Sequence, residues 1–173
     1  GQFDTEVIST MMENTSQPII FPLSNPTSNC EGLPVDILTQ TDGKALVATG
    51  SPFEPVELNG KTYPIGQGNN AFIFPGLGFA AILAEASEIT NGMILAGAYA
   101  LAEYTLAHHG DTGLIYPPIA ELRTACKVVT RKVLDQAIAD GVAGNAELEG
   151  ADLDAYIEAN IWNPEYMPIT AKS

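Results

Sequence analysis

The sequence predicts an α/β fold that combines a parallel βαβ unit, a β-hairpin and a largely helical C-terminal half. Two short apolar runs, residues 18–24 and 44–51, have the β-branched and aromatic content of buried strands. Between them, residues 33–41 have a helical pattern with Pro34 near the first turn. Because two buried strands joined by a helix are typical of a parallel sheet, these segments predict a βαβ unit.

Further elements are expected on both sides of this unit. Residues 5–14 have an amphipathic pattern that Asp4 or Thr5 could cap. Asn59-Gly60 lies between two short alternating segments, which favours a hairpin over residues 56–63. Residues 66–70 are then expected to form a polar loop. Helices are expected over residues 75–87, 91–110, 119–141 and 152–162, with Gly110 and Gly141 as stops.

The third of these helices is expected to bury one broad face. The apolar residues at compatible spacing are Ile119, Leu122, Val129, Val133 and Ile138.

The charge of the chain excludes several kinds of partner. Seven basic residues stand against 21 acidic ones, and the net charge is −14, which argues against nucleic acid and against an anionic membrane. The longest apolar run, residues 71–84, is too short to span a bilayer and contains Pro75. With no signal-peptide pattern at the N-terminus, the sequence indicates a cytoplasmic protein. Cys30 and Cys126 are expected to be reduced thiols.

Two glycine-rich stretches fit the loose dinucleotide-binding pattern. Gly66-x-Gly68-x-x-Ala71 follows the predicted hairpin, whereas a phosphate loop follows a strand and opens a helix. Gly76-x-Gly78-x-x-Ala81 lies inside a predicted helix, where small residues allow close helix packing. Neither stretch is therefore expected to be a phosphate loop.

The asparagines after the strands are better candidates for a binding site. Asn25 follows the first predicted strand, and Asn69 and Asn70 follow the second at a longer distance. Ligands of parallel sheets collect at the carboxyl ends of the strands, and a primary amide offers a donor and an acceptor without charge. The alternative is that these asparagines only stabilise turns.

Other polar groups are weaker candidates. His108, His109 and Asp111 could form a metal site, but histidines at a helix end also complement the helix dipole. Asp152 and Asp154 are expected on a solvated helix face. The residues alone indicate a neutral polar binding surface with no obvious acid, base or metal site.

Long blocks of the sequence closely resemble the C-terminal part of malic enzymes. These blocks are IIFPLSNPT, TDGKALVATGSPFEPVELNGKTYPIGQGNNAFIFPGLG and GLIYPPIAELR. DGKALVATG and IWNPEY are also similar to the malolactic enzymes of that family. The resemblance implies a partial Rossmann-type NAD(P)-binding domain that covers residues 1–173 as a single domain, ends in a helix and tail at residues 145–173, and is a fragment of a longer enzyme.

The resemblance also assigns roles to individual residues. It implies that Asn25 and Asn69 contact L-malate, and that Ser24 and Asn70 lie beside them on the nicotinamide side as cofactor-binding residues. The family's catalytic Tyr and Lys, its three acidic ligands of Mn²⁺ or Mg²⁺ and its true phosphate loop belong to the region N-terminal to this one. This chain is therefore expected to hold no catalytic residue and no metal ligand, and to be inactive when isolated.

The activity implied for the whole enzyme is the oxidative decarboxylation of L-malate to pyruvate and CO₂ with NAD or NADP. One alternative is the malolactic reaction, in which L-malate gives L-lactate and CO₂ and NAD is retained. A further alternative is a binding module without catalysis. The expected partners are L-malate, the N-terminal remainder of the same enzyme and further copies in a homodimer or larger homo-oligomer.

Overall fold

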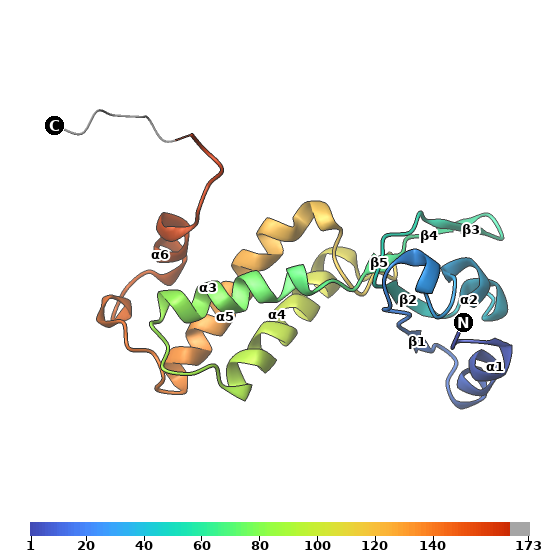
Figure 1. Cartoon of the computed structure of the whole chain (residues 1–173), viewed down its shortest axis with the longest axis horizontal. Helices are drawn as coiled ribbons and strands as arrows, with labels where there is room; N and C mark the ends of the chain where they lie inside the picture. Colours follow the sequence, from blue (N-terminus) through green and yellow to red (C-terminus); the bar gives the residue numbers. More distant parts are fainter. Residues whose placement is uncertain (167–173) are drawn as a thin grey trace.

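The structure is a computed structural model of the chain that describes residues 1–166. Figure 1 shows two halves that follow one another along the long axis of the molecule. We call residues 1–68 the sheet half and residues 69–166 the helical half. Each half has its own group of buried apolar side chains. The last seven residues of the expected C-terminal tail lie outside the described part of the chain.

The sheet half contains the predicted βαβ unit. Helix α1 (Thr5–Asn14) precedes strand β1 (Ile19–Ile20), and helix α2 (Pro34–Gln40) connects β1 to strand β2 (Leu46–Thr49). Strands β1 and β2 pair in parallel, which confirms the prediction. The Asp4 carboxylate caps α1 by accepting a hydrogen bond of 3.0 Å from the Val7 N–H.

A third parallel strand lies where a polar loop was expected. Strand β5 (Gly66–Gln67) pairs with β2, so the sheet order is β1-β2-β5 and the loop prediction was wrong for these two residues. Glycine weakens a strand pattern, but here it allows close packing, since a Cβ on Gly66 would lie 3.3 Å from the Tyr116 nitrogen. The packing of a distant segment, which local propensity does not reveal, therefore determines this strand.

The predicted hairpin is confirmed. Strands β3 (Val56–Leu58) and β4 (Lys61–Tyr63) pair in antiparallel fashion around Asn59-Gly60. Asn59 has φ 53° and Gly60 has φ 75°, which is the pair of positive values that a tight two-residue hairpin turn requires.

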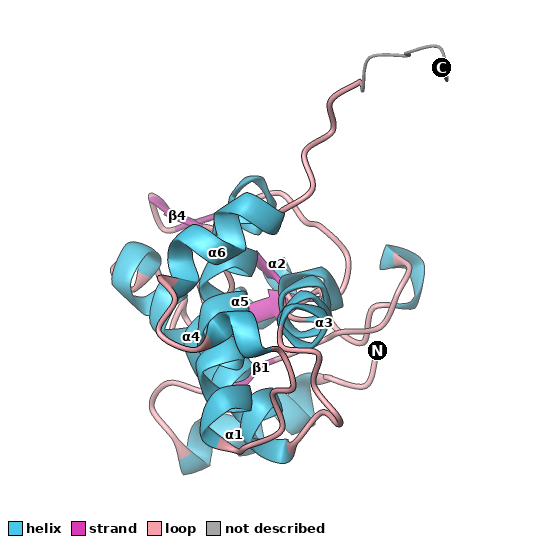
Figure 2. Cartoon of the chain, turned by 90° about the vertical axis from the view of Figure 1, so that its left-hand side faces the viewer, coloured by secondary structure: helices cyan, strands magenta, loops and turns pink. Residues whose placement is uncertain are grey.

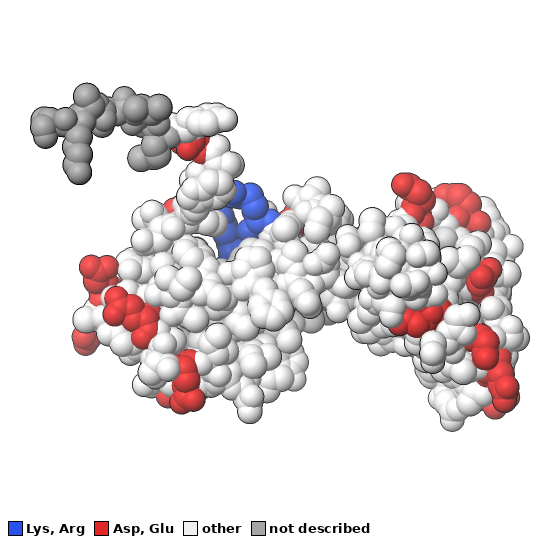
Figure 3. Space-filling view, viewed as in Figure 1, with Lys and Arg blue, Asp and Glu red and all other residues white. Residues whose placement is uncertain are grey.

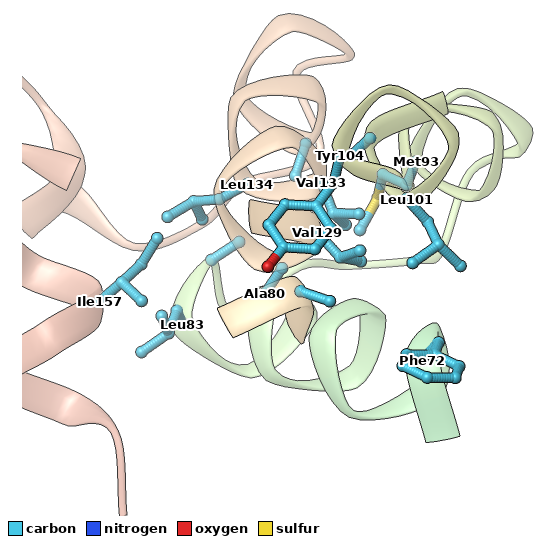
Figure 4. Close-up of a cluster of buried hydrophobic side chains, with 14 of the residues drawn as sticks. Phe72, Ala80, Leu83, Met93, Leu101, Tyr104, Val129, Val133, Leu134 and Ile157 are labelled. Carbon is cyan, nitrogen blue, oxygen red and sulfur yellow. The ribbon is translucent and has the colours of Figure 1, made fainter. Parts of the chain in front are cut away.

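The helical half packs around one central helix. Its elements are α3 (Phe74–Leu83), α4 (Asn91–His109), α5 (Leu122–Ala139) and α6 (Leu153–Asn160), with short 3₁₀ turns η2 (Asn70–Phe72), η3 (Ile119–Glu121) and η4 (Ala146–Leu148); a further turn, η1 (Thr27–Asn29), lies in the sheet half. Figure 2, which views the molecule from the helical end, shows α3, α4 and α5 bundled together. In Figure 4, Val129 and Val133 of α5 meet Ala80 of α3 and Leu101 of α4.

The buried face of α5 differs from the predicted one. Val129 and Val133 are fully buried as expected, but Ile119 is 53% exposed and Ile138 is 42% exposed. The positions that complete the face are Ala125, Thr130, Leu134 and Ala137. Small residues serve here because α3 approaches closely: a Cβ on Gly76 would lie 2.7 Å from Val129 Cγ1. This confirms the expected close packing at Gly76 but not at Gly78, which has open space beside it.

Basic residues are concentrated on α5, and two of them form ion pairs with acidic residues of α6. Lys127 Nζ lies 2.5 Å from Glu158 Oε2, and Arg131 pairs with Asp135 and Asp154. Figure 3 shows a group of basic side chains on the helical half, whereas acidic side chains are scattered over both halves. Asp154 is therefore exposed as expected but also paired. Such surface ion pairs each contribute about 0–1 kcal/mol.

Two smaller expectations concern the cysteines and the membrane. Cys30 and Cys126 are free thiols, as expected. Among the helices of residues 1–166, none has both the length and the apolar character needed to cross a bilayer.

The end of α4 is fastened to the start of α5 by a cluster of titratable groups. Tyr104 Oη donates a hydrogen bond of 2.8 Å to the Glu121 carboxylate, and His109 Nε2 lies 3.0 Å from both carboxylate oxygens. The hydrogen bond from His109, and then that from Tyr104, lowers the pKa of Glu121 below its usual value of 4.5.

This cluster predicts a stability difference that disappears in acid. Because the folded-state pKa of Glu121 is lowered, its contribution to stability is present above pH 4.5 and is lost as the pH falls through the folded pKa. At neutral pH the protein should therefore melt at a higher temperature than its Glu121→Gln variant, and the two melting temperatures should converge below pH 4.5. Thermal unfolding from pH 7 to pH 3 measures this. A difference that stays constant across that range would contradict the assigned role of the carboxylate.

Candidate functional site

The ends of three strands meet at one edge of the sheet. The Gly50 N–H donates to the Pro22 carbonyl at 3.2 Å, and the Gly68 N–H donates to the Thr49 carbonyl at 2.8 Å. The ladder thus continues past the carboxyl ends of β1, β2 and β5. Asn25 follows the first of these ends and Asn69 follows the third. Both lie at the edge where parallel sheets bind their ligands.

The Asn25 amide is held by the neighbouring strand end. Its Oδ1 accepts a hydrogen bond of 2.5 Å from the hydroxyl of Ser51, which is 7% exposed. Its Nδ2 lies beside Gly50, 3.2 Å from the position that a Cβ would take there. Within residues 1–166, Asn25 Nδ2 forms no hydrogen bond, so both of its N–H groups remain free for a ligand.

The Asn69 amide has a similar arrangement. Its Oδ1 accepts a hydrogen bond of 2.9 Å from the Ala71 N–H and so caps the turn η2. Its Nδ2 has no partner in the described part of the chain. The turn-stabilising alternative therefore accounts for Oδ1 and leaves the N–H groups unexplained. Asn70 is the exposed first residue of η2.

A pocket of about 340 Å³ opens beside Asn69 and Asn70 at the junction of the two halves. Its lining comes from the strand ends, from α4 and from the segment before α5: Leu23, Gly68, Asn69, Asn70, Ile73, Ala98, Leu101, Ala102, Ile115 and Tyr116. Asn25 and Ser24 lie on the adjoining turn, immediately after Leu23. The structure thus places two of the four predicted residues on the pocket wall, and the other two on the turn that follows Leu23.

Tyr116 forms the wall behind the glycine-rich strand end. Its ring centroid lies 6.1 Å from that of Phe21 and 6.4 Å from that of Phe72. A Cβ on Gly68 would lie 3.4 Å from the Tyr116 ring and 2.8 Å from Leu23 Cδ2. Glycine at this position therefore lets both side chains close around the start of the asparagine turn.

Ser24 also forms hydrogen bonds within the protein. Its hydroxyl donates to the Glu31 carboxylate, and its N–H donates to the same carboxylate at 3.1 Å. The hydrogen bond from the Ser24 hydroxyl is the largest cause of the lowered pKa of Glu31. With its proton used in this way, the Ser24 hydroxyl can offer a ligand only its oxygen lone pairs.

Sequence reasoning missed three residues that shape the site. Ser51 lies two residues after β2, just as Asn69 lies two residues after β5, so its position after a buried strand was an available signal. Gln67 Nε2 donates to the Gly50 carbonyl at 3.2 Å and ties two strand ends together. Tyr116 had no such signal, because it comes from a segment far along the chain.

A second pocket, of about 330 Å³, lies at the amino end of β2 and includes Lys44 and Lys61. Lys61 Nζ lies 4.7 Å from the centre of the Tyr63 ring. This is the end of the sheet opposite to the asparagines, and parallel sheets do not normally bind ligands there.

The histidines of α4 are not arranged as metal ligands. His109 contacts Glu121, and His108 stacks on Tyr104 with 4.3 Å between ring centroids. Among residues 1–166, no three His, Cys, Asp or Glu side chains are grouped so that they could hold a metal ion. The described residues therefore do not fit a metal site.

A parallel sheet that carries amide donors at its carboxyl edge, with helices packed beyond it, defines a partial Rossmann-type nucleotide-binding domain. The sequence matches the family described as "Malic enzyme, NAD binding domain" over residues 1–138, and the chain belongs to that family.

Relatives and a solved structure agree with this assignment. The chain is 45% identical over 166 residues to an NAD-dependent malic enzyme of Aeromonas hydrophila, which covers 96% of this chain and 29% of the relative. It is 47% identical over 167 residues to an NAD-dependent malic enzyme of Aliivibrio fischeri, again covering 96% and 29%. The crystal structure of Entamoeba histolytica malic enzyme superposes with a TM-score of 0.71 and 28% identity, over 92% of this chain and 29% of that one. The chain thus spans about 29% of the length of these relatives.

Proposed function

We propose that this chain is the C-terminal portion of the NAD-binding domain of an enzyme that oxidatively decarboxylates L-malate to pyruvate and CO₂. The observation that carries the proposal is that the side-chain amides of Asn25 and Asn69 have the same hydrogen-bonding pattern. In both, Oδ1 accepts a hydrogen bond inside the protein and Nδ2 is left free at the carboxyl edge of the sheet. The site therefore offers N–H donors to an oxygen-rich ligand.

Neutral amide donors suit L-malate in a chain of this charge. The substrate carries two carboxylates and a hydroxyl, which are all hydrogen-bond acceptors, and the net charge of −14 repels such an anion at long range. Local donors aimed at its oxygens offset that repulsion. Asparagine does not titrate, so the donors neither change with pH nor exchange protons with the substrate. We assign malate binding to Asn25 and Asn69.

NAD is the cofactor that the proposal assigns to the site. When bound, NAD would supply the hydride acceptor for the oxidation of malate at C2, with pyruvate, CO₂ and NADH as products. Ser24 offers an acceptor oxygen, which suits the amide N–H groups of a nicotinamide carboxamide. Asn70, at the exposed start of η2, provides both a donor and an acceptor beside it. These two residues are the proposed contacts of the chain with the cofactor.

An exposed face of β1 supports the view that a longer enzyme completes this domain. Ile19 of β1, and Phe21 and Leu23 of the segment that continues it, are 55%, 39% and 41% exposed. Parallel sheets are normally covered on both faces, so a further layer is expected to pack here. The metal ligands and the acid and base groups would belong to that missing part. Assembly into a homo-oligomer remains a prediction.

The products of the full-length enzyme test this proposal. With L-malate, NAD and Mn²⁺ or Mg²⁺, we expect pyruvate and NADH in equal amounts, and a slower reaction with NADP. Lactate without accumulation of NADH would instead establish the malolactic reaction. The isolated 173-residue chain is the control and should show no turnover. Absence of malate turnover by the full-length enzyme would overturn both reactions and favour the binding module.

A further inference from the structure

We propose that Ser51 is a positioning residue for malate binding, which anchors the Asn25 amide at the carboxyl edge of the sheet. This inference rests on the proposed function of Asn25. The Ser51 hydroxyl holds the amide through the hydrogen bond of 2.5 Å that it donates to Asn25 Oδ1.

The surroundings of Ser51 keep its hydroxyl in place. The residue is 7% exposed, and the Thr49 hydroxyl donates to the Ser51 carbonyl at 2.8 Å. Gln67 Nε2 holds the preceding carbonyl, that of Gly50, at 3.2 Å. Two strand ends therefore fix the backbone on both sides of Ser51, whereas Asn25 lies on an exposed turn. The buried Ser51 therefore holds the exposed Asn25 side chain in place.

Removing the Ser51 hydroxyl should affect the binding of malate alone. Without the hydroxyl, the amide loses its only hydrogen bond to the rest of residues 1–166 and can rotate freely, so it is no longer held in position for malate. The affinity for malate falls, while the affinity for NAD and the chemical step are unaffected, because Asn25 is not assigned to either.

Steady-state kinetics of the full-length enzyme test this inference. Ser51→Ala should raise the KM for malate roughly 3- to 10-fold, the equivalent of one net hydrogen bond, with KM for NAD and kcat nearly unchanged. In an Asn25→Ala background the same substitution should have no further effect, because the two residues act through one contact. Ser51→Cys fills the same space with a weak donor and should behave like Ser51→Ala.

Thr41→Val is the matched control. It removes a different buried hydroxyl, which accepts from the Ala45 N–H at the opposite end of β2, so it should lower the melting temperature and leave kcat and KM for malate unchanged. If Ser51→Ala lowers kcat and the melting temperature but leaves KM for malate unchanged, Ser51 is only structural and the inference fails. Equal effects of Ser51→Ala with and without Asn25 also overturn it. If Asn25→Ala itself leaves malate kinetics unchanged, the proposed role of Asn25 fails as well.

Discussion

Replacing Gly50 by alanine should destabilise the protein by about 1–3 kcal/mol, the usual cost of overpacking. A Cβ at this position would lie 2.0 Å from the Leu23 carbonyl oxygen and 2.6 Å from its carbon. Both atoms belong to the backbone, so no side chain can rotate away to relieve the overlap. The ends of β1 and β2 would have to separate, which breaks the hydrogen bond from Gly50 to Pro22. Denaturant unfolding followed by circular dichroism measures the loss.

The same substitution should lower kcat/KM for malate in the full-length enzyme, because the displaced segment carries Asn25. Gly78→Ala is the matched control, since nothing lies within 4 Å of the added Cβ and the residue is inside α3. Alanine is a better helix former than glycine by about 1 kcal/mol, so this variant should be as stable as the parent or more stable. If both alanine variants unfold at the same denaturant concentration as the parent, the close approach of the two strand ends does not exist.

Asn69→Ala in the full-length enzyme should lower kcat/KM for malate by roughly 5- to 150-fold, which corresponds to about 1–3 kcal/mol for an unpaired polar partner. It should also lower stability, because Asn69 Oδ1 caps η2. Asn69→Asp separates the two effects. Aspartate keeps an oxygen for the Ala71 N–H but replaces the N–H donors with a negative charge.

We therefore expect Asn69→Asp to melt near the parent temperature and to lose at least as much kcat/KM for malate as Asn69→Ala. Asn59→Gly is the control for removal of an amide elsewhere: glycine accepts the φ of 53° at this hairpin position, and malate kinetics should be unchanged. Near-normal malate kinetics of Asn69→Asp would mean that this asparagine serves only the turn.

Local chemistry allowed much of the fold to be predicted. The start of α1 at Asp4, the turn at Asn59-Gly60 and the parallel pairing of β1 with β2 all follow from short-range patterns. The third strand could not be predicted in this way, since Gly66 and Gln67 have low strand propensity and are held by β2 and by Tyr116.

The candidate site was predictable only in part, for a related reason. Asn25 and Asn69 stand out because polar residues after buried strands mark the binding edge of a parallel sheet. The Oδ1 atoms of these two residues accept hydrogen bonds from the Ser51 hydroxyl and the Ala71 N–H. Such contacts are known only once the folded chain is seen. The same holds for the buried face of α5, where Ala125 and Ala137 replaced the larger residues expected, because helix packing selected small side chains.

The most direct test is a crystal structure of the full-length enzyme with L-malate, NAD and a divalent metal ion. The proposal predicts that Nδ2 of both Asn25 and Asn69 lies about 2.7–3.2 Å from oxygens of malate. It also predicts that Asn25 Oδ1 still accepts the Ser51 hydroxyl in that complex. A structure in which malate binds elsewhere, and in which both Nδ2 atoms contact only water, would contradict the account.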